Sequence, residues 1–214
     1  MNPGPVRCLK AAQGAALVVV LCTLIVVLML GVSAAQMALQ GEKAARGERD
    51  RHTAFQAAEA ALTDAENDIE GSLGAPGRSA LFGSGSALGF VDGCGSGNVD
   101  LGLCLPGGQG KPPAWQVIDF AAADADVATG TMRFVPYGKF TGAAMHTGHG
   151  FLPAKASRYI IELLPSTQPG DDAGTAQHYF YRITALGFGA RDTTQVVLQS
   201  HYRKPGPPFG KVTP

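Results

Sequence analysis

The chain has no excess of either charge. Over 214 residues, 17 lysine and arginine side chains balance 17 aspartate and glutamate side chains. Without a net charge there is no long-range field to attract nucleic acid or an acidic partner, so nucleic-acid binding is disfavoured. The length leaves room for one ordinary domain and an anchor, and two large cores are not expected.

Complete metal-binding motifs are also missing. His146 and His149 lie close in sequence, but a zinc site needs three or four ligands and no partner motif is near them. Asp124 and Asp126 begin like a calcium loop, yet Ala128 stands where a third oxygen ligand belongs. These residues are interpreted as solvated loop positions.

Two glycine-rich runs fail to complete a nucleotide-binding motif. Residues 107–111 resemble a phosphate loop, but Leu105 replaces its first glycine and Pro112 its hydroxyl residue. Residues 83–89 miss the dinucleotide spacing and follow no predicted strand. No serine nucleophile elbow or cysteine–histidine motif occurs in the sequence, which therefore predicts neither an enzyme nor a cofactor.

Cysteine is scarce outside the apolar N-terminal region. Cys8 precedes the apolar run, and Cys22 lies inside it, where a thiol behaves as a small apolar residue. A disulfide between Cys94 and Cys104 would close a small loop, contribute roughly 2–3 kcal/mol and require an oxidising compartment. Two free thiols are the alternative.

Charge is absent between Lys10 and Glu42. The apolar core of this stretch, residues 15–35, contains 21 residues. At about 1.5 Å per residue it forms a helix of roughly 31 Å, which matches the hydrocarbon core of a bilayer. Arg7 and Lys10 precede it without acidic neighbours, so the positive-inside tendency predicts a cytoplasmic N-terminus and an exported remainder. Basic residues within 43–51 oppose this orientation, but acidic residues alternate with them.

Three other interpretations of this stretch differ in processing. A cleavable secretory signal fits the basic start and the small residues at 32–34. A lipoprotein signal would need a small residue before Cys22, where Leu21 stands, so that interpretation fails. An anchor without any processing remains open beside the secretory signal.

Residues 36–70 predict an exported continuation of the same helix. They are rich in Ala, Glu, Gln and Arg, and Gly71 marks the expected helix end. Polar residues such as Asp64 are expected mostly on faces other than the apolar one. One apolar stripe at alternating spacings of three and four is expected to pack on the domain core: Phe55, Ala58, Leu62, Ala65 and Ile69.

Glycines interrupt the region where the helix would leave the membrane. Gly31, Gly41 and Gly47 each cost about 1 kcal/mol relative to alanine in a helix interior. The sequence therefore predicts a bend or local melting there.

The remaining sequence predicts an α+β domain over residues 71–204. Residues 71–114 are loop-like, and an antiparallel meander follows, with residues 189–192 as its last hairpin loop. The long N-terminal helix packs on this C-terminal sheet, and the tail 205–214 is expected to be mobile. The strand candidates are residues 131–137, 158–164, 178–188 and 193–202.

Several segments together resemble the PilX-type minor pilins of bacterial type IV pili. The resemblance covers both ends and most of the chain, and FQAAEAAL with the terminal hairpin is its most specific part. The segments are QGAALVV at 13–19, ERDRHTAFQAAEAALTDAE at 48–66, GLCLP at 102–106 with PAW at 113–115, and YRITALGFGARDTTQVVLQSHY at 181–202.

The resemblance implies a pilin-like fold and a processing site. Residues 1–14 would be a leader that a prepilin peptidase removes after Gly14 on the cytoplasmic face, methylating the new amine of Ala15. The helix 15–35 would first span the inner membrane, with the domain in the periplasm, and later pack in the filament. One apolar surface serves both environments because both are dry.

Val19 departs from the pilin pattern, since most pilins carry glutamate there. A carboxylate in the bilayer is costly unless paired, and that glutamate is usually explained as meeting the N-terminal amine of the preceding subunit. Val19 cannot make this contact, which fits a subunit with nothing above it at the filament tip.

The resemblance implies a minor pilin that primes or supports pilus assembly by packing. Its partners would be other minor pilins, the major pilin, the prepilin peptidase, the inner-membrane assembly platform and a tip adhesin. A pseudopilin of a type II secretion system is one alternative. The other is a periplasmic binding module released by signal peptidase, which would begin near Ala35 or Gln36.

Overall fold

The computed structural model describes residues 13–71, 78–82, 87–108, 110–120, 122, 132–165 and 179–204. Residues 1–12 of the expected leader, the calcium-like aspartates at 124 and 126, and the tail 205–214 lie outside these ranges. The chain forms two compact units, residues 1–48 and 49–214, and each is described by itself.

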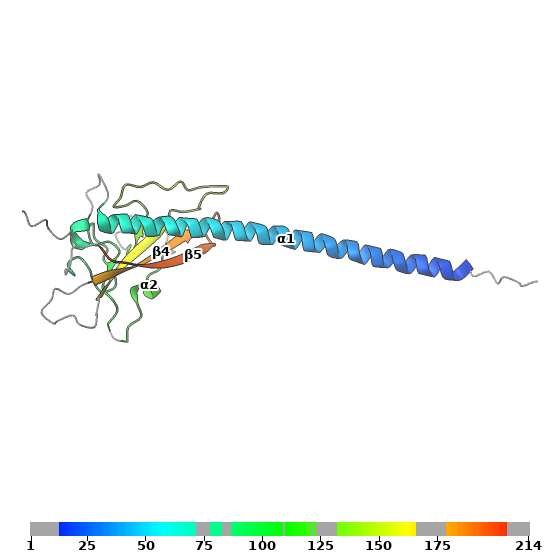
Figure 1. The fold of residues 1–214 in the computed structure, drawn as a ribbon, viewed down its shortest axis with the longest axis horizontal. Coiled ribbons are helices and arrows are strands. Elements are labelled where there is room, and N and C mark those ends of the chain that lie inside the picture. Colours follow the sequence, from blue (N-terminus) through cyan, green and yellow to red (C-terminus); the bar gives the residue numbers. More distant parts are fainter. Residues whose placement is uncertain are drawn as a thin grey trace, which may run out of the picture. The chain divides into compact units, whose positions relative to one another are not determined.

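Helix α1 spans Gln13–Glu70 without interruption (Figure 1). The predicted local melting at Gly31, Gly41 and Gly47 was wrong, because all three glycines are helical. Helix propagation is cooperative, and the strong helix formers around each glycine outweigh its cost. The predicted end is correct: Gly71 has φ 90°, and its N–H donates to the carbonyl oxygen of Asn67 at 3.0 Å.

The second unit contains a mixed sheet with the strand order β1-β3-β4-β5, in which β2 also pairs with β3. The antiparallel pairing of β2, β3, β4 and β5 agrees with the expected meander. The elements are η1 (Ser79–Phe82), β1 (Leu103–Cys104), α2 (Ala114–Val117), β2 (Val135–Pro136), β3 (Arg158–Pro165), β4 (Tyr179–Phe188) and β5 (Gln195–Tyr202).

The expectation of a purely antiparallel sheet was wrong at β1, which pairs parallel with β3. A strand of two residues shows no alternation, so periodicity cannot reveal it. The first strand candidate, 131–137, shortens to β2, and the last hairpin loop lengthens to residues 189–194. The N–H of Gly189 donates to the carbonyl oxygen of Thr194 at 2.8 Å and closes this loop.

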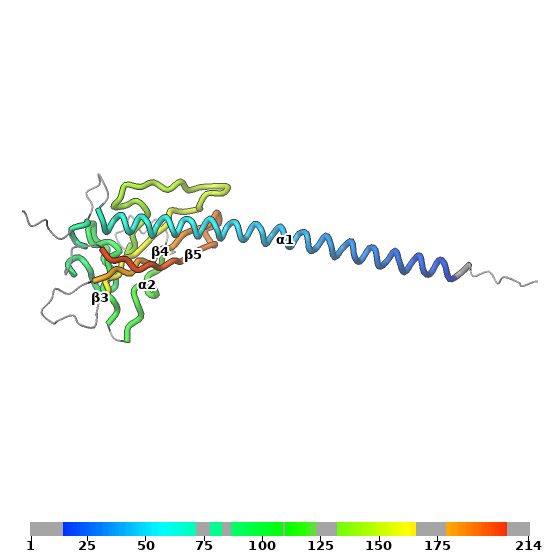
Figure 2. The backbone as a smooth tube through the Cα atoms, viewed as in Figure 1, coloured from blue at the N-terminus to red at the C-terminus, as the bar shows by residue number. Residues whose placement is uncertain are grey.

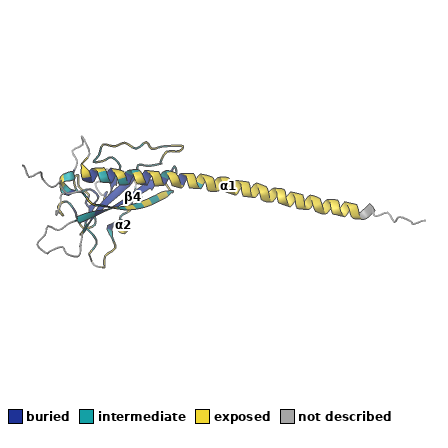
Figure 3. Cartoon of the chain, in the orientation of Figure 1, coloured by how far each residue is buried: buried dark blue, intermediate teal, exposed yellow. Residues whose placement is uncertain are grey.

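The core lies on both faces of the sheet. Residues 49–70 of α1 lie along one face (Figures 1 and 2). Gly187 of β4 meets the helix backbone there. The segment from β1 to β2 covers the other face, where the N–H of Ala114 donates to Glu162 at 3.0 Å. Side chains alternate between the two faces along a strand, so a central strand that is covered on both faces is buried along its length. Most of β4 is buried in this way (Figure 3).

Candidate functional site

The first unit presents an apolar helical surface that nothing in the unit covers. From Leu17 to Leu39 its large apolar side chains are exposed, for example Met29 at 67% and Met37 at 72% (Figure 3). Among the described residues, one helix, α1, is long and apolar enough to cross a membrane. A contiguous apolar surface of this size needs lipid or protein against it.

Two hydroxyl groups of this surface are satisfied within the helix. The Thr23 hydroxyl donates to the carbonyl oxygen of Val20 at 2.9 Å, and the Ser33 hydroxyl donates to that of Met29 at 2.8 Å. Hydroxyls bonded to their own helix need no water, which suits a dry environment.

The predicted processing site lies at the start of this helix. Gly14 and Ala15 are in the first turn of α1, and Val19 follows about one turn later and is 61% exposed. No charged side chain occurs from Ala15 to Gly41. The apolar surface therefore begins directly after Gly14.

In the second unit, α1 packs on the sheet through small side chains. Of the expected stripe, Ala58, Ala65 and Ile69 are fully buried, and Leu62 is half-buried against the core. The expectation for Phe55 was wrong, because 39% of this residue is exposed. Buried alanines complete the packing face: Ala54, Ala57 and Ala61.

A close approach of backbones explains why alanine replaces larger residues. A Cβ on Gly187 would lie 2.1 Å from the carbonyl oxygen of Ala54 and 2.4 Å from the nitrogen of Ala58. Helix and strand therefore touch through main-chain atoms, which leaves no room for a ring such as that of Phe55. The repeated alanines of AFQAAEAA, together with Gly187, were the available sequence signal.

Three aspartates form a buried acidic face on this part of α1: Asp50, Asp64 and Asp68. Asp50 binds the loop between β4 and β5. Its carboxylate accepts from Arg191 Nε at 2.9 Å and from the Thr194 hydroxyl at 2.6 Å. Burial alone would raise the pKa of Asp50, but the hydrogen bonds from Thr194 and Arg191 outweigh it and lower the pKa.

Asp64 is buried and binds the loop after β2, a contact that no sequence pattern predicts. It accepts from the backbone N–H of Gly138 at 2.7 Å and from the Thr141 hydroxyl. Burial raises the pKa of Asp64, the two hydrogen bonds oppose this, and the charge of Asp68 adds to the rise. The register of Asp64 and Asp68, four residues apart, places both carboxylates on the same inner face.

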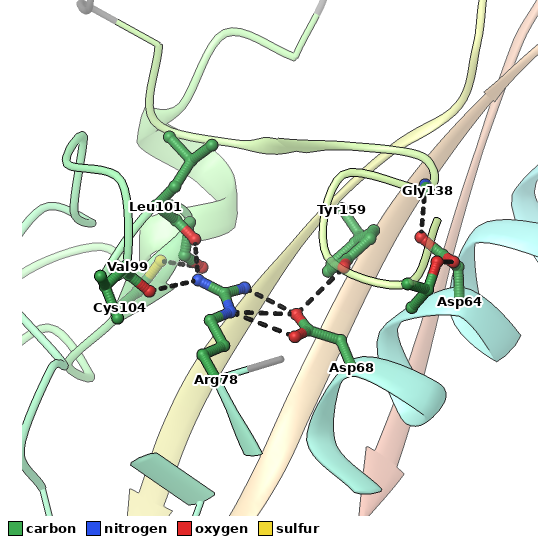
Figure 4. Close-up of polar contacts among 10 residues, drawn as sticks. Asp64, Asp68, Arg78, Val99, Leu101, Cys104, Gly138 and Tyr159 are labelled. Carbon is green, nitrogen blue, oxygen red and sulfur yellow. Dashed lines mark hydrogen bonds and ion pairs between the residues drawn. The ribbon is translucent and has the colours of Figure 1, made fainter. Parts of the chain in front are cut away.

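Asp68 forms a buried ion pair with Arg78, shown in Figure 4. Arg78 Nη2 lies 2.7 Å from Asp68 Oδ2, and the Tyr159 hydroxyl donates to the same oxygen at 3.0 Å. Arg78 Nη1 donates to the carbonyl oxygens of Val99 at 3.0 Å and Leu101 at 2.5 Å. The guanidinium of Arg78 thus donates hydrogen bonds to a carboxylate and to two carbonyl oxygens, which offsets the cost of burying its charge.

The carbonyls that Arg78 binds belong to the loop closed by the disulfide Cys94–Cys104. Cys104 is also the last residue of β1, which pairs with β3. Contacts therefore run from the C-terminal end of α1 through Arg78 and the disulfide loop into the sheet. No sequence pattern indicates the role of Arg78, because its partners are main-chain oxygens and an aspartate ten residues away.

The histidines considered as metal ligands lie apart from this network. His146 and His149 lie in the segment between β2 and β3, and both are exposed. Within the described ranges, no group of three or more His, Cys, Asp or Glu side chains is placed to hold a metal ion.

A long apolar helix whose C-terminal part packs on a C-terminal sheet defines the pilin-like class of α+β proteins. A family model described as PilX N-terminal matches residues 13–63, and one described as type IV pilus assembly protein PilX C-term matches residues 100–204. The chain belongs to the PilX family of type IV pilus assembly proteins. Comparisons with curated proteins and with solved structures gave no match.

Proposed function

We propose that this chain is a minor pilin that primes or supports type IV pilus assembly by helix packing with other pilins. The observation that supports it most is the exposed, uncharged apolar surface of α1 from Ala15 to Gly41. A surface without catalytic groups acts by being buried, first in lipid and then among other helices. The partners would be other minor pilins, the major pilin, the assembly platform and a tip adhesin.

In this proposal the prepilin peptidase removes residues 1–14 after Gly14 and methylates Ala15. Before assembly the helix 15–35 spans the inner membrane once, with Arg7 and Lys10 on the cytoplasmic side. Residues 36–70 and 71–204 then lie in the periplasm, where the Cys94–Cys104 disulfide is stable.

Val19 supports a place at the filament tip. An unpaired carboxylate at the centre of a dry helix bundle costs about 2.5–3.5 kcal/mol, so a glutamate suits only a subunit with a partner amine above it. Valine at this position suits a subunit that starts the filament.

The substitution Val19→Glu tests the tip position. We expect fewer surface pili, counted by electron microscopy, because the first subunit would carry a carboxylate without a partner. Val19→Leu is the matched control and should leave the count unchanged. Immunogold labelling of an epitope-tagged wild-type subunit should mark filament ends.

Label along the whole shaft, together with normal pilus numbers for Val19→Glu, would exclude the tip position. A deletion that abolishes release of exported proteins and leaves surface pili intact would instead favour a secretion pseudopilin.

A further inference from the structure

Strand β5 forms one edge of the sheet in the second unit. It pairs with β4 over its full length, from Phe188↔Gln195 to Tyr181↔Tyr202. Within the described part of the chain, no backbone hydrogen bond joins β5 to any other strand. In Figure 1 β5 is the orange to red strand beside β4.

The register fixes which backbone groups of β5 remain open. Gly189 and Thr194 form a hydrogen-bonded pair next to Phe188↔Gln195. In an antiparallel ladder, hydrogen-bonded and non-bonded pairs alternate, so residues 196, 198, 200 and 202 direct their N–H and C=O groups to β4. Those of Gln195, Val197, Gln199 and His201 point away from the sheet.

This edge lacks the features that usually prevent strand addition. QVVLQSHY contains no lysine, proline or glycine, and its register with β4 is continuous, without a bulge. Exposed edges are normally protected by such residues or by bulges. An eight-residue edge without them, with Val197 51% exposed, is open to a further strand.

Antiparallel pairing with β5 of a second copy of this chain does not fit the edge. The part of α1 in this unit runs parallel to β5, because Asp50 binds Thr194 at one end and Glu70 binds Tyr202 at the other. Antiparallel pairing of two β5 strands would direct the two helices oppositely, which conflicts with the membrane anchoring proposed above. The opposite edge offers only β1 and β2, of two residues each.

The side chains beside the edge define the chemistry of the partner. On the face that bears α1, Val196, Leu198 and Tyr202 are half-buried, and an added strand would cover them with its alternate residues. On the other face the neighbours are Gln195, Val197, Gln199 and His201, all of them exposed. The complementary segment therefore carries apolar side chains toward α1, whereas its other face meets both polar and apolar neighbours.

We propose that β5 accepts an extended segment of a different protein as an additional strand of the sheet, with apolar residues toward α1. Main-chain hydrogen bonds to residues 195, 197, 199 and 201 would hold the segment, and the row of Val196, Leu198 and Tyr202 would select its side chains.

The test uses p-benzoylphenylalanine, placed singly at positions 195–202 of the full-length chain in piliated cells. Crosslinked peptides are identified by mass spectrometry. We expect one partner other than this chain, with its crosslinked residue moving by one position for each position along β5. The same label at Val117, which is exposed on α2, is the control for random contact.

Val197→Pro and Gln199→Pro each remove an outward N–H and none of the β4–β5 hydrogen bonds. We expect each to lower adduct formation at least about tenfold, while Val197→Thr, which keeps the N–H, leaves it unchanged. Trp115 fluorescence checks that the variants fold.

The proposal would be overturned if no adducts form, if they form with this chain itself, or if the crosslinked residue does not move in step along β5. Full crosslinking by both proline variants would also overturn it. None of these results would alter the N-terminus of the mature chain, so this proposal and the pilin assignment can fail separately.

Discussion

At the scale of single residues, buried carboxylates join α1 to the rest of the second unit. Asp50, Asp64 and Asp68 each bind a different segment: the β4–β5 loop, the loop after β2, and Arg78. A buried charge is costly unless it is paired and hydrogen-bonded. Asp50 and Asp68 each pair with an arginine, whereas Asp64 is held by hydrogen bonds alone. The acidic face therefore specifies one position of the helix on the sheet, whereas alanine packing alone would allow sliding.

Arg78→Met should destabilise the second unit by about 3–5 kcal/mol, because it leaves Asp68 buried without its cation. The measurement is urea unfolding of the detergent-solubilised chain, followed by the fluorescence of its single tryptophan, Trp115. Lys111→Met removes the exposed pair with Asp92 and serves as the control, with a change within about 0.5 kcal/mol. Equal effects of the two variants would show that the buried pair has no special role.

Asp64→Asn should change how stability depends on pH. Because the pKa of Asp64 is raised above 3.8, its contribution to stability is complete below that pH and is lost as the pH rises through the folded value. Asparagine can keep both contacts, accepting from Gly138 and donating to the Thr141 hydroxyl, without a charge to bury. The free energy of unfolding of the variant, relative to wild type, should increase from about pH 4 to pH 7.

Unfolding curves at several pH values measure this difference. A relative stability that falls as the pH rises would show that the ionised carboxylate is favoured in the folded protein, and would contradict the expected sign.

At the scale of elements, α1 and β4 approach each other closely enough for their backbones to touch. Gly187→Ala would place a Cβ against the backbone of Ala54 and Ala58, which cannot move aside as a flexible side chain can. We expect a loss of about 1–3 kcal/mol in unfolding free energy, as for an overpacked core. Gly108→Ala has nothing within 4 Å of the new Cβ and should change stability by less than about 0.5 kcal/mol.

The spacing of apolar residues in the sequence predicts those helices and strands that are long enough for the spacing to repeat. Helix α1 and strands β3, β4 and β5 follow from helix formers and β-branched runs, and Gly71 marks the helix end correctly. Strands β1 and β2 have two residues each and depend on pairing with β3, so no local pattern reveals them.

The exposure of Phe55 and the burial of Asp64 have separate causes. A hydrophobic stripe assumes that the largest apolar side chains face the core, whereas here the helix and sheet backbones touch and select alanine. Asp64 is buried because its partners, Gly138 and Thr141, lie more than seventy residues away. Such long-range partners are not visible in the sequence around a residue.

At the scale of the whole molecule, the two units bury apolar surface by different means. In residues 49–214 the core is internal, between α1, the sheet and the segments that cover its other face. In residues 1–48 the apolar side chains from Leu17 to Leu39 are all exposed, and burial must come from lipid or from other subunits. The first unit is thus suited to anchoring and assembly.

We propose that α1 starts the mature chain and serves as an assembly surface. This proposal is tested most directly by determining the N-terminus of the mature protein by mass spectrometry of subunits purified from membranes and from pili. We predict a chain that begins at Ala15 with a methylated amine in both fractions. A chain that begins near Gln36, without the apolar helix, would contradict the account.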